Sequence, residues 1–199
     1  MDLALLYQSS TEPVTLTQAK DFLAVDHDEH DTMIQALITA ARQRAENYCN
    51  RSFVEKRYML AVDSFPARSR LKLPRGPVQS IVAVKYWDGT EDQTLATEKY
   101  EIDQFSDPAF IHFTEPVSVA SKLNALKIQY VTGYDIDDAD NEENTDPAYP
   151  FPEPVRTAIK MIVRTMYDHR DDFVVGAAVN SIPKTSEYIL NDYRIFEFL

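Results

Sequence analysis

The sequence predicts an α+β protein in which a helical domain, built from N- and C-terminal helices, carries an inserted small antiparallel β unit. Two observations predict this class: apolar residues recur with helical period in residues 15–50 and 154–170, and strand-like segments fill residues 52–134. The 199 residues are enough for one domain or two small ones with a hydrophobic core. Because neither long helix can bury its apolar stripe alone, we expect the two to pack against each other.

Capping signals and periodicity place the helices. Thr15 and Gln18 have the spacing of a capping box, which predicts a short helix that ends near Leu23. A longer helix follows, and Pro154 suits the first turn of a second long helix. A further short helix is predicted at residues 185–191. The apolar stripes of the two long helices comprise Ile34, Leu37, Ile38, Ala41, Ala45 and Tyr48, and Val155, Ala158, Ile159, Ile162, Val163 and Met166.

The middle of the chain predicts five or six antiparallel strands. Its segments alternate in polarity or are rich in β-branched and aromatic residues, and Asp88-Gly89 is a strong hairpin signal. These segments lie at 54–62, 70–74, 78–87, 100–103, 110–113 and 126–130. The chain is thus divided into N-terminal helices of the helical core (1–51), the inserted β unit (52–134), an acidic, proline-rich loop (135–153), and a C-terminal helix with a tail (154–199).

The spacing of glycines excludes several kinds of active site. The chain has only four glycines, at positions 76, 89, 133 and 176. A dinucleotide-binding loop needs three glycines within six residues, a P-loop needs two glycines five apart, and a nucleophile elbow needs two glycines around a serine. None of these loops can form with glycines so far apart.

The cysteine count and the lengths of the apolar runs indicate which cellular compartments the chain fits. Cys49 is the single cysteine, which excludes an intrachain disulfide and a multi-cysteine zinc site and fits a reducing cytosol. The first residues lack the basic region and long apolar run of a signal peptide. The longest apolar stretch, residues 173–179, is too short to span a membrane.

The net charge of −12 is concentrated in one segment. Residues 135–153 hold eight carboxylates and no Lys or Arg, which leaves −4 for the other 180 residues. General affinity for DNA phosphates needs clustered Lys and Arg, so this charge argues against it. The sequence therefore predicts a nearly balanced body and one strongly acidic segment.

Two acidic segments are candidate metal sites. His27 and His30 stand among carboxylates in residues 26–31, and such side chains bind divalent ions, but their position at a helix start favours helix capping. Residues 135–143 superficially resemble a calcium loop but lack its central glycine, which favours a solvated loop. A metal-assisted hydrolase that uses one of these clusters is the alternative function.

The C-terminus is unusually apolar. Ile195, Phe196, Phe198 and Leu199 place apolar surface where chains are usually polar and frayed. Two interpretations stay open. These residues either pack on the core of this subunit or fill a groove on a partner.

Several short segments, taken in order along nearly the whole chain, carry a family resemblance. They are VTLTQAK (14–20), FL (22–23), AENYCNR (45–51), LPRGPVQSI (73–81) with Tyr86, IQYVTGY (128–134), PEPVRTAI (152–159), YDHR (167–170) and ILNDYR (189–194). Each segment has low specificity by itself. In this order and spacing, the chain resembles the head–tail connector (adaptor, or head completion) proteins of long-tailed bacteriophages and gene transfer agents.

The resemblance implies a structural virion protein with no enzymatic activity and no cofactor. Members form a homo-oligomeric ring, typically a dodecamer, under the portal protein at the capsid vertex. They join the portal to a tail-side neck or tail completion protein, and DNA passes through the channel without specific binding. The resemblance therefore implies a location in the virion neck, and in the host cytoplasm during assembly, with no membrane partner.

The resemblance also implies where partners bind. C-terminal segments of the family reach onto the portal, which by position would be residues 171–199 here. The residues that we expect to dock there are Tyr188, Leu190, Tyr193, Arg194, Ile195, Phe196, Phe198 and Leu199. Acidic walls would not hold DNA phosphates, so we hypothesise that carboxylates of residues 135–146 face the channel or a neck partner. These are Asp135, Asp137, Asp138, Asp140, Glu142 and Glu143.

Overall fold

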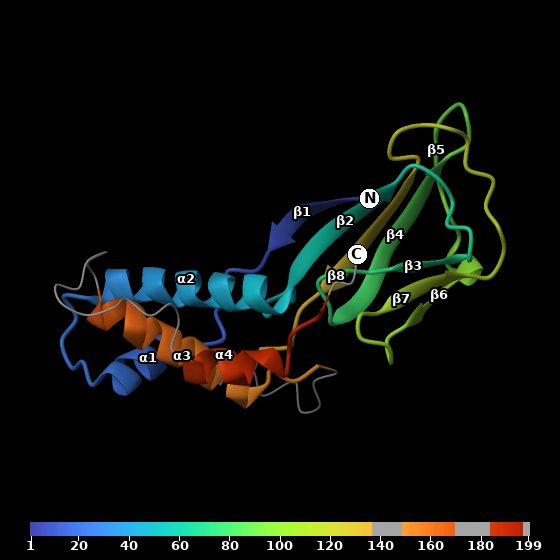
Figure 1. The fold of residues 1–199 in the computed structure, drawn as a ribbon. Coiled ribbons are helices and arrows are strands. Elements are labelled where there is room, and N and C mark those ends of the chain that lie inside the picture. The colour runs from blue at the N-terminus through green and yellow to red at the C-terminus, as the bar shows by residue number, and fades with distance from the viewer. Residues whose placement is uncertain (137–148, 170–183, 197–199) are drawn as a thin grey trace. The chain divides into compact units, whose positions relative to one another are not determined.

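The computed structural model describes residues 1–136, 149–169 and 184–196 and shows an α+β protein, as the sequence predicts (Figure 1). All strand pairs are antiparallel, and the helices come from both ends of the chain. Within the described residues, none of the helices has the length and hydropathy needed to cross a membrane.

The chain divides into two compact units. The strand unit comprises residues 1–10 and 54–135, and the helical unit comprises residues 11–53 and 136–199. The sequence predicts residues 1–51 as part of the helical core, whereas the structure places the first ten in the strand unit. There β1 (Asp2–Gln8) pairs with a strand more than fifty residues later, a long-range contact that local patterns do not report.

A five-stranded sheet forms the body of the strand unit (Figure 1). Its order is β1, β2 (Lys56–Val62), β8 (Leu126–Thr132), β4 (Val78–Trp87) and β5 (Asp92–Thr94). Every second residue of β8 is buried, so one face of this central strand packs into the core. Tyr130 lies there with its hydroxyl donating to the carbonyl oxygen of Pro74 at 3.0 Å, and burial raises the pKa of this phenol well above its usual value.

A three-stranded sheet completes the strand unit. Its order is β3 (Arg70–Lys72), β7 (Phe110–Phe113) and β6 (Tyr100–Asp103), and a 3₁₀ turn at Thr97–Lys99 leads into β6. Apolar residues of both sheets share one core. Its fully buried members are Leu60, Leu73, Val84, Ile111, Leu126, Ile128 and Tyr130.

The described residues form eight strands rather than the five or six that the sequence predicts. The additional strands are β1 and β5. β5 is only three polar residues long, so it has no apolar pattern, and pairing with β4 through the Asp88-Gly89 turn defines it. Asp88 accepts the backbone N–H groups of Glu91 and Thr90 at 2.9 and 2.7 Å, which holds the pKa of this carboxyl well below its usual range.

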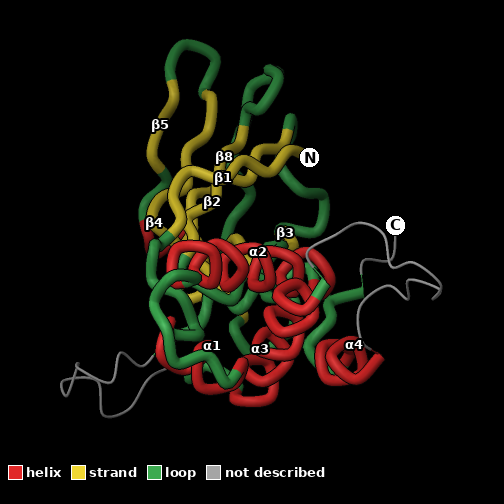
Figure 2. The backbone as a smooth tube through the Cα atoms, turned by 90° about the vertical axis from the view of Figure 1, so that its left-hand side faces the viewer, coloured by secondary structure: helices red, strands yellow, loops and turns green. Residues whose placement is uncertain are grey.

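Four helices make up the described part of the helical unit: α1 (Leu16–Leu23), α2 (Asp31–Cys49), α3 (Glu153–Asp168) and α4 (Lys184–Asn191). α3 contacts each of the other three (Figure 2). Buried residues of the predicted stripes, including Ile34 and Ile38 of α2 and Ile159 and Val163 of α3, form the interior. The two long helices therefore bury their stripes against each other, as predicted.

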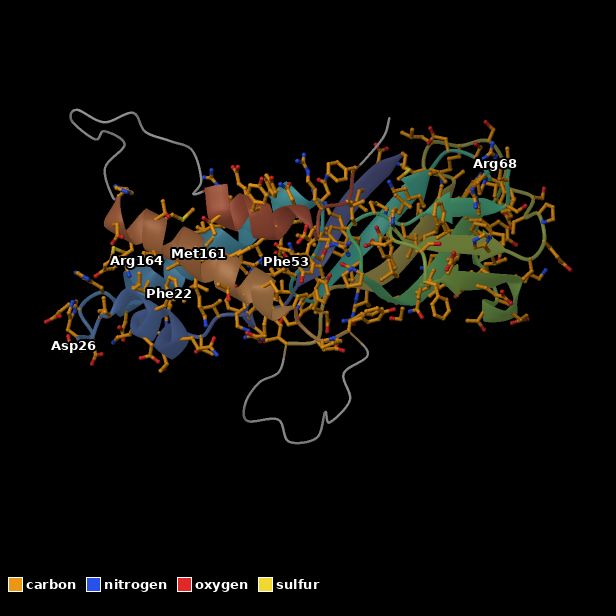
Figure 3. All side chains as sticks on the ribbon, turned by 60° about the horizontal axis from the view of Figure 1, so that its bottom comes forward. Phe22, Asp26, Phe53, Arg68, Met161 and Arg164 are labelled. Atoms are coloured by element: carbon orange, nitrogen blue, oxygen red, sulfur yellow. The ribbon has the colours of Figure 1, made fainter. Side chains whose placement is uncertain are left out.

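Local signals at the ends of α1 behave as the sequence predicts. The Thr15 hydroxyl accepts the N–H of Gln18 at 3.2 Å, and the Gln18 side chain accepts the N–H of Thr15 at 3.3 Å. Figure 3 shows Phe22 of α1 together with Met161 and Arg164 of α3. The Arg164 guanidinium donates to the backbone oxygen of Phe22 at 3.4 Å, which ties these two helices together.

Two buried arginines hold the segment that enters the helical unit. Arg42 is 1% exposed and donates to both oxygens of Glu12 at 2.7 and 3.1 Å, and to Glu46 one turn further along α2 at 2.7 Å. Arg156 of α3 donates to the backbone oxygen of Pro13. Glu12 and Pro13, which precede α1, are thus bound to Arg42 of α2 and to Arg156 of α3. Both buried guanidinium groups have hydrogen-bond partners.

Candidate partner-binding surface

The predicted docking segment is anchored on the C-terminal end of α2. Helix α4 is followed by a turn and an irregular stretch whose backbone meets residues 49–51. The N–H of Ile195 donates to the backbone oxygen of Cys49 at 2.9 Å, and the Asn50 side chain donates to the backbone oxygen of Ile195 at 3.1 Å. The Arg51 side chain donates to the backbone oxygen of Tyr193 at 2.5 Å. These bonds fix the path of the chain after α4.

Asn50 gives this anchor its geometry. It ends α2 in the left-handed conformation, with φ of 53°, which asparagine adopts more readily than most residues. The turn exposes the last carbonyl groups of α2, for which the helix has no N–H donors of its own. The backbone oxygen of Cys49 accepts the N–H of Ile195, and the Cys49 thiol donates to the backbone oxygen of Leu190 at 3.3 Å.

The structure separates the predicted docking residues into two groups. Leu190 and Ile195 are 0% and 6% exposed and belong to the core of the helical unit. Tyr188 and Phe196 are 78% and 58% exposed, and Arg194 is exposed as well. Tyr193 is half-buried, while Phe198 and Leu199 lie outside the described residues. For the apolar tail, Ile195 thus packs on its own subunit and Phe196 presents its ring to solvent.

An aromatic and cationic cluster lies on this surface. The Arg194 guanidinium lies 5.0 Å from the ring centroid of Tyr48 and 5.2 Å from that of Phe196. We call Tyr48, Arg194 and Phe196 the Arg194 cluster. Arginine and aromatic side chains on a fixed backbone are the residue types that dominate binding energy in protein interfaces.

The apolar pattern of α2 predicts Tyr48 as a core residue, whereas the structure leaves it half-buried on this surface, and no local signal assigns a binding role to Asn50 or Arg51. Tyr48 donates its hydroxyl to the Asn191 side chain at 2.7 Å, and Asn50 and Arg51 hold the tail as described. They stand in the AENYCNR segment that carries part of the family resemblance, but no local signal connects them with residues that follow more than 140 positions later. Only the fold brings these two segments together.

The predicted acidic face is described at one position. Asp135 closes the strand unit, where its carboxylate lies 3.4 Å from the side-chain nitrogen of Gln79. Asp137, Asp138, Asp140, Glu142 and Glu143 lie outside the described residues. Glu153, the last carboxylate of the acidic segment, pairs with Arg156 at 2.8 Å within α3.

The acidic segment at residues 26–31 provides no side-chain cap at the N-cap of α2, contrary to the interpretation from sequence, although Asp31 lies in the first turn, where a carboxylate suits the helix dipole. The N-cap residue is His30, and its side chain makes no capping bond. Its ring nitrogen lies 2.7 Å from the Tyr167 hydroxyl instead. Asp28 and Asp31 reach Lys20 of α1 at 2.6 and 2.8 Å, because a lysine one helix away offers a full charge.

These contacts also bear on metal binding at residues 26–31. The His27 ring pairs with Glu29 at 2.6 Å, while His30 turns to Tyr167, so the two imidazoles have different partners. Among the residues with described positions, no group of three or more His, Cys, Asp or Glu side chains could hold a metal ion. No observation on the described residues supports the hydrolase alternative, and residues 137–143 of its second acidic cluster lie outside them.

Solved structures share this fold over 98% or more of the chain. In the neck of an empty gene transfer agent particle computed with C6 symmetry, the matching chain has a TM-score of 0.75 and 15% identity, with 100% of this chain and 98% of that chain covered. A chain in the virion of a native particle matches with a TM-score of 0.75 and 14% identity, over 100% and 98%. One in the native neck computed with C12 symmetry has a TM-score of 0.68 and 17% identity, over 98% and 97%.

The chain thus has the fold of proteins found in the necks and virions of gene transfer agent particles. The model of the phage gp6-like head-tail connector protein family matches residues 13–118, which is more than half of the chain. The chain belongs to this head-tail connector family, and its role is structural. Among curated proteins, no sequence matches it.

Proposed function

We propose that the chain forms a ring under the portal of a tailed phage or related particle, and that this ring joins the capsid to the tail and leaves a channel for DNA. The observation that carries the proposal is the match over 98% or more of the chain to proteins of particle necks computed with C6 and C12 symmetry. A ring subunit needs contact surfaces rather than chemistry, so we propose no enzymatic step. The protein would act in the virion neck after assembly in the host cytoplasm.

The charge of the chain suits a conduit for DNA. A channel wall that grips phosphates would slow the passage of DNA, whereas a net charge of −12 gives no general attraction to it. We propose that carboxylates of the acidic segment face this channel or a neck partner. Replacement of Asp137, Asp138, Asp140, Glu142 and Glu143 with Asn or Gln should then change assembly or DNA ejection, and an unchanged yield of infectious or transducing particles would contradict this part of the proposal.

The exposed members of the C-terminal segment form the proposed portal contact. Tyr188 and the Arg194 cluster present aromatic and cationic groups to solvent, while Leu190 and Ile195 hold the segment on α2. Two roles are thus divided between neighbouring residues. Truncation after Arg194 would remove an anchor together with the contact, so single substitutions at exposed positions are the sharper test.

The ring is tested by electron microscopy of the full chain mixed with portal assemblies, and of intact particles. We expect a ring of this chain below the portal. If the chain alone is a stable monomer, the experiment with portal decides, because ring assembly can depend on the portal. Absence of the chain from the neck of purified particles would overturn the proposed function.

Phe196→Ala and Tyr188→Ala should each weaken portal binding by about tenfold, the loss expected for an aromatic anchor. Both side chains are largely exposed, so thermal unfolding should stay unchanged. The matched control is Phe105→Ala, which removes an exposed aromatic from the strand unit. Equal portal affinity for Phe196→Ala, Tyr188→Ala and the wild type, measured by biolayer interferometry, would contradict this docking surface.

A further inference from the structure

The first strand of the chain presents apolar side chains that the strand unit does not bury. All residues of β1 from Asp2 to Tyr7 are exposed. Leu3, Leu5, Leu6 and Tyr7 are 38%, 51%, 48% and 49% exposed, so side chains on both faces of the strand meet solvent. Single exposed apolar residues are ordinary, but consecutive ones on one strand mark an interaction surface. We call these four residues the β1 surface.

β1 also forms an edge of the five-stranded sheet. It pairs with β2 along one side, and no described strand lies along the other (Figure 1). Proteins usually protect such an edge with Lys, Pro or inward-pointing charges, because exposed apolar edges aggregate. The sequence of β1, DLALLYQ, contains no Lys, Arg or Pro. A monomer in solution would carry an unprotected edge, so we expect the β1 surface to be covered in the assembled protein.

The irregular register of β1 indicates how it is covered. Leu5 pairs with Tyr58 and Tyr7 with Arg57, so Leu6 is an extra residue at a register shift. Such a bulge interrupts the regular spacing of N–H and C=O groups that a further strand would need. Contact through the side chains of the β1 surface is therefore favoured over extension of the sheet.

We propose that a second copy of this chain packs against the β1 surface and that this contact joins neighbours in the ring. The inference rests on the proposed ring. In a ring, each subunit contacts its two neighbours through two different surfaces. Each copy of one surface therefore has one neighbouring copy of this chain to cover it. A surface used in this way must be exposed on each isolated subunit, as the β1 surface is.

Charge supports a second copy as the occupant. Two copies with a net charge of −12 each repel one another, which favours a contact where charge is sparse. β1 holds a single charged side chain, Asp2, in seven residues. Burial of Leu5 and Tyr7 against apolar atoms of a neighbour would offset the repulsion without a need for opposite charges.

The contact is tested in assembled particles by photo-cross-linking. Tyr7 is replaced with benzoylphenylalanine in the full chain, purified particles are irradiated, and the linked peptides are identified by mass spectrometry. We expect links from position 7 to peptides of this same chain in a species of twice the mass of one chain, which distinguishes a second copy from a link within one copy. The inference would be overturned by links only to another neck protein, by links only within one copy, or by no links. A ring of this chain in the same particles would leave the proposed function intact in each of these cases. Particles without the chain in their neck would instead overturn the proposed function and the inference with it.

Substitutions give a second, independent test. Leu5→Glu should lower the amount of chain incorporated into ring assemblies by about tenfold, because it places a charge in the contact. Leu123→Glu adds the same charge at a loop residue of the strand unit that is 72% exposed, and it should incorporate as the wild type does. Thermal unfolding of both purified variants shows that the fold is kept. Normal incorporation of a folded Leu5→Glu chain would overturn the inference.

Discussion

At the scale of single residues, paired buried charge organises the helical unit. Arg42 neutralises Glu46, which is 2% exposed and also accepts the N–H of Phe53 at 2.8 Å. The same guanidinium binds Glu12, so the segment before α1 and helix α2 meet at one cation. Buried pairs of this kind contribute modestly as a whole, but loss of one partner is costly.

Arg42→Met should therefore destabilise the chain by about 3–5 kcal/mol, because the Glu46 carboxylate stays buried without its guanidinium. The free energy of unfolding is measured by urea denaturation. Arg44→Met is the matched control, since Arg44 is an exposed residue of the same helix and its replacement should change stability by less than about 0.5 kcal/mol. A loss below about 1 kcal/mol for Arg42→Met would show that the network does not carry this role.

Cys49 is the residue that reports on the α2 anchor. Burial raises the pKa of its thiol to about 12, from a reference value of 9.0. Near pH 8 the folded chain should hold about a thousandfold less thiolate than an unfolded chain, and should react with a disulfide reagent correspondingly slowly. Unfolding in guanidinium should restore fast reaction.

The same pKa shift has a consequence for stability. A thiol whose pKa is raised on folding contributes stability that is fully present below pH 9 and is lost as the pH rises toward 12. Ala substitution at Cys49 removes this part of the pH dependence. Rapid labelling of the native wild-type chain at pH 8 would contradict the buried anchor.

At the scale of elements, Gly133 controls how β8 ends beside the start of β2. Its φ of +120° lies in the region that favours glycine, and a Cβ there would lie 2.6 Å from the carbonyl carbon of Val54. Gly89 has a similar φ of +113°, but its Cβ would meet only Ala120 at 3.6 Å, an ordinary contact. The two glycines therefore share backbone conformation and differ in the space around them.

Gly133→Ala should cost about 3 kcal/mol or more, because backbone strain and a close backbone contact add together. Gly89→Ala should cost about 1 kcal/mol, from backbone strain alone. Urea denaturation of the two variants measures the difference. Equal losses would show that the approach of β8 to Val54 relaxes without cost.

How far the sequence predicts elements depends on how local their signals are. β4, β6 and β7 begin and end where the sequence places them, because alternation and turn residues stand next to each other in the chain. The capping box of α1 is confirmed for the same reason. β1 and β5 escape prediction because each exists only through its pairing with another strand. The position of β8 between β2 and β4 likewise depends on contacts far apart in sequence.

The docking surface is less predictable than the elements. Ile195 and Phe196 are adjacent apolar residues with the same local signal, yet one is buried and the other is exposed. The difference arises from backbone bonds to Cys49 and Asn50, which fix the path of the tail. Composition predicts an apolar terminus, whereas only the anchor on α2 determines which of its residues remain available to a partner.

At the scale of the whole molecule, charge and apolar contact oppose each other during assembly. Each copy carries a net charge of −12, so neighbours in the proposed ring repel at low ionic strength. Screening shortens the range of this repulsion, since the Debye length falls from about 10 Å in 0.1 M salt to about 3 Å in 1 M salt. The apolar contact that we propose at β1 is not weakened by screening.

Ring assembly of the full chain on portal should therefore become stronger as salt rises, by about tenfold in apparent affinity between roughly 0.1 and 1 M sodium chloride. Sedimentation velocity measures the bound fraction at each salt concentration. A contact made of opposite charges would show the reverse trend, because salt screens attraction as well as repulsion. Leu5→Glu separates the two contributions: it adds one more negative charge per copy within the contact, so its assembly should depend on salt more steeply than that of the wild type. Weaker assembly of the wild type at high salt would show that charge pairs, and not the β1 surface, hold neighbouring copies together.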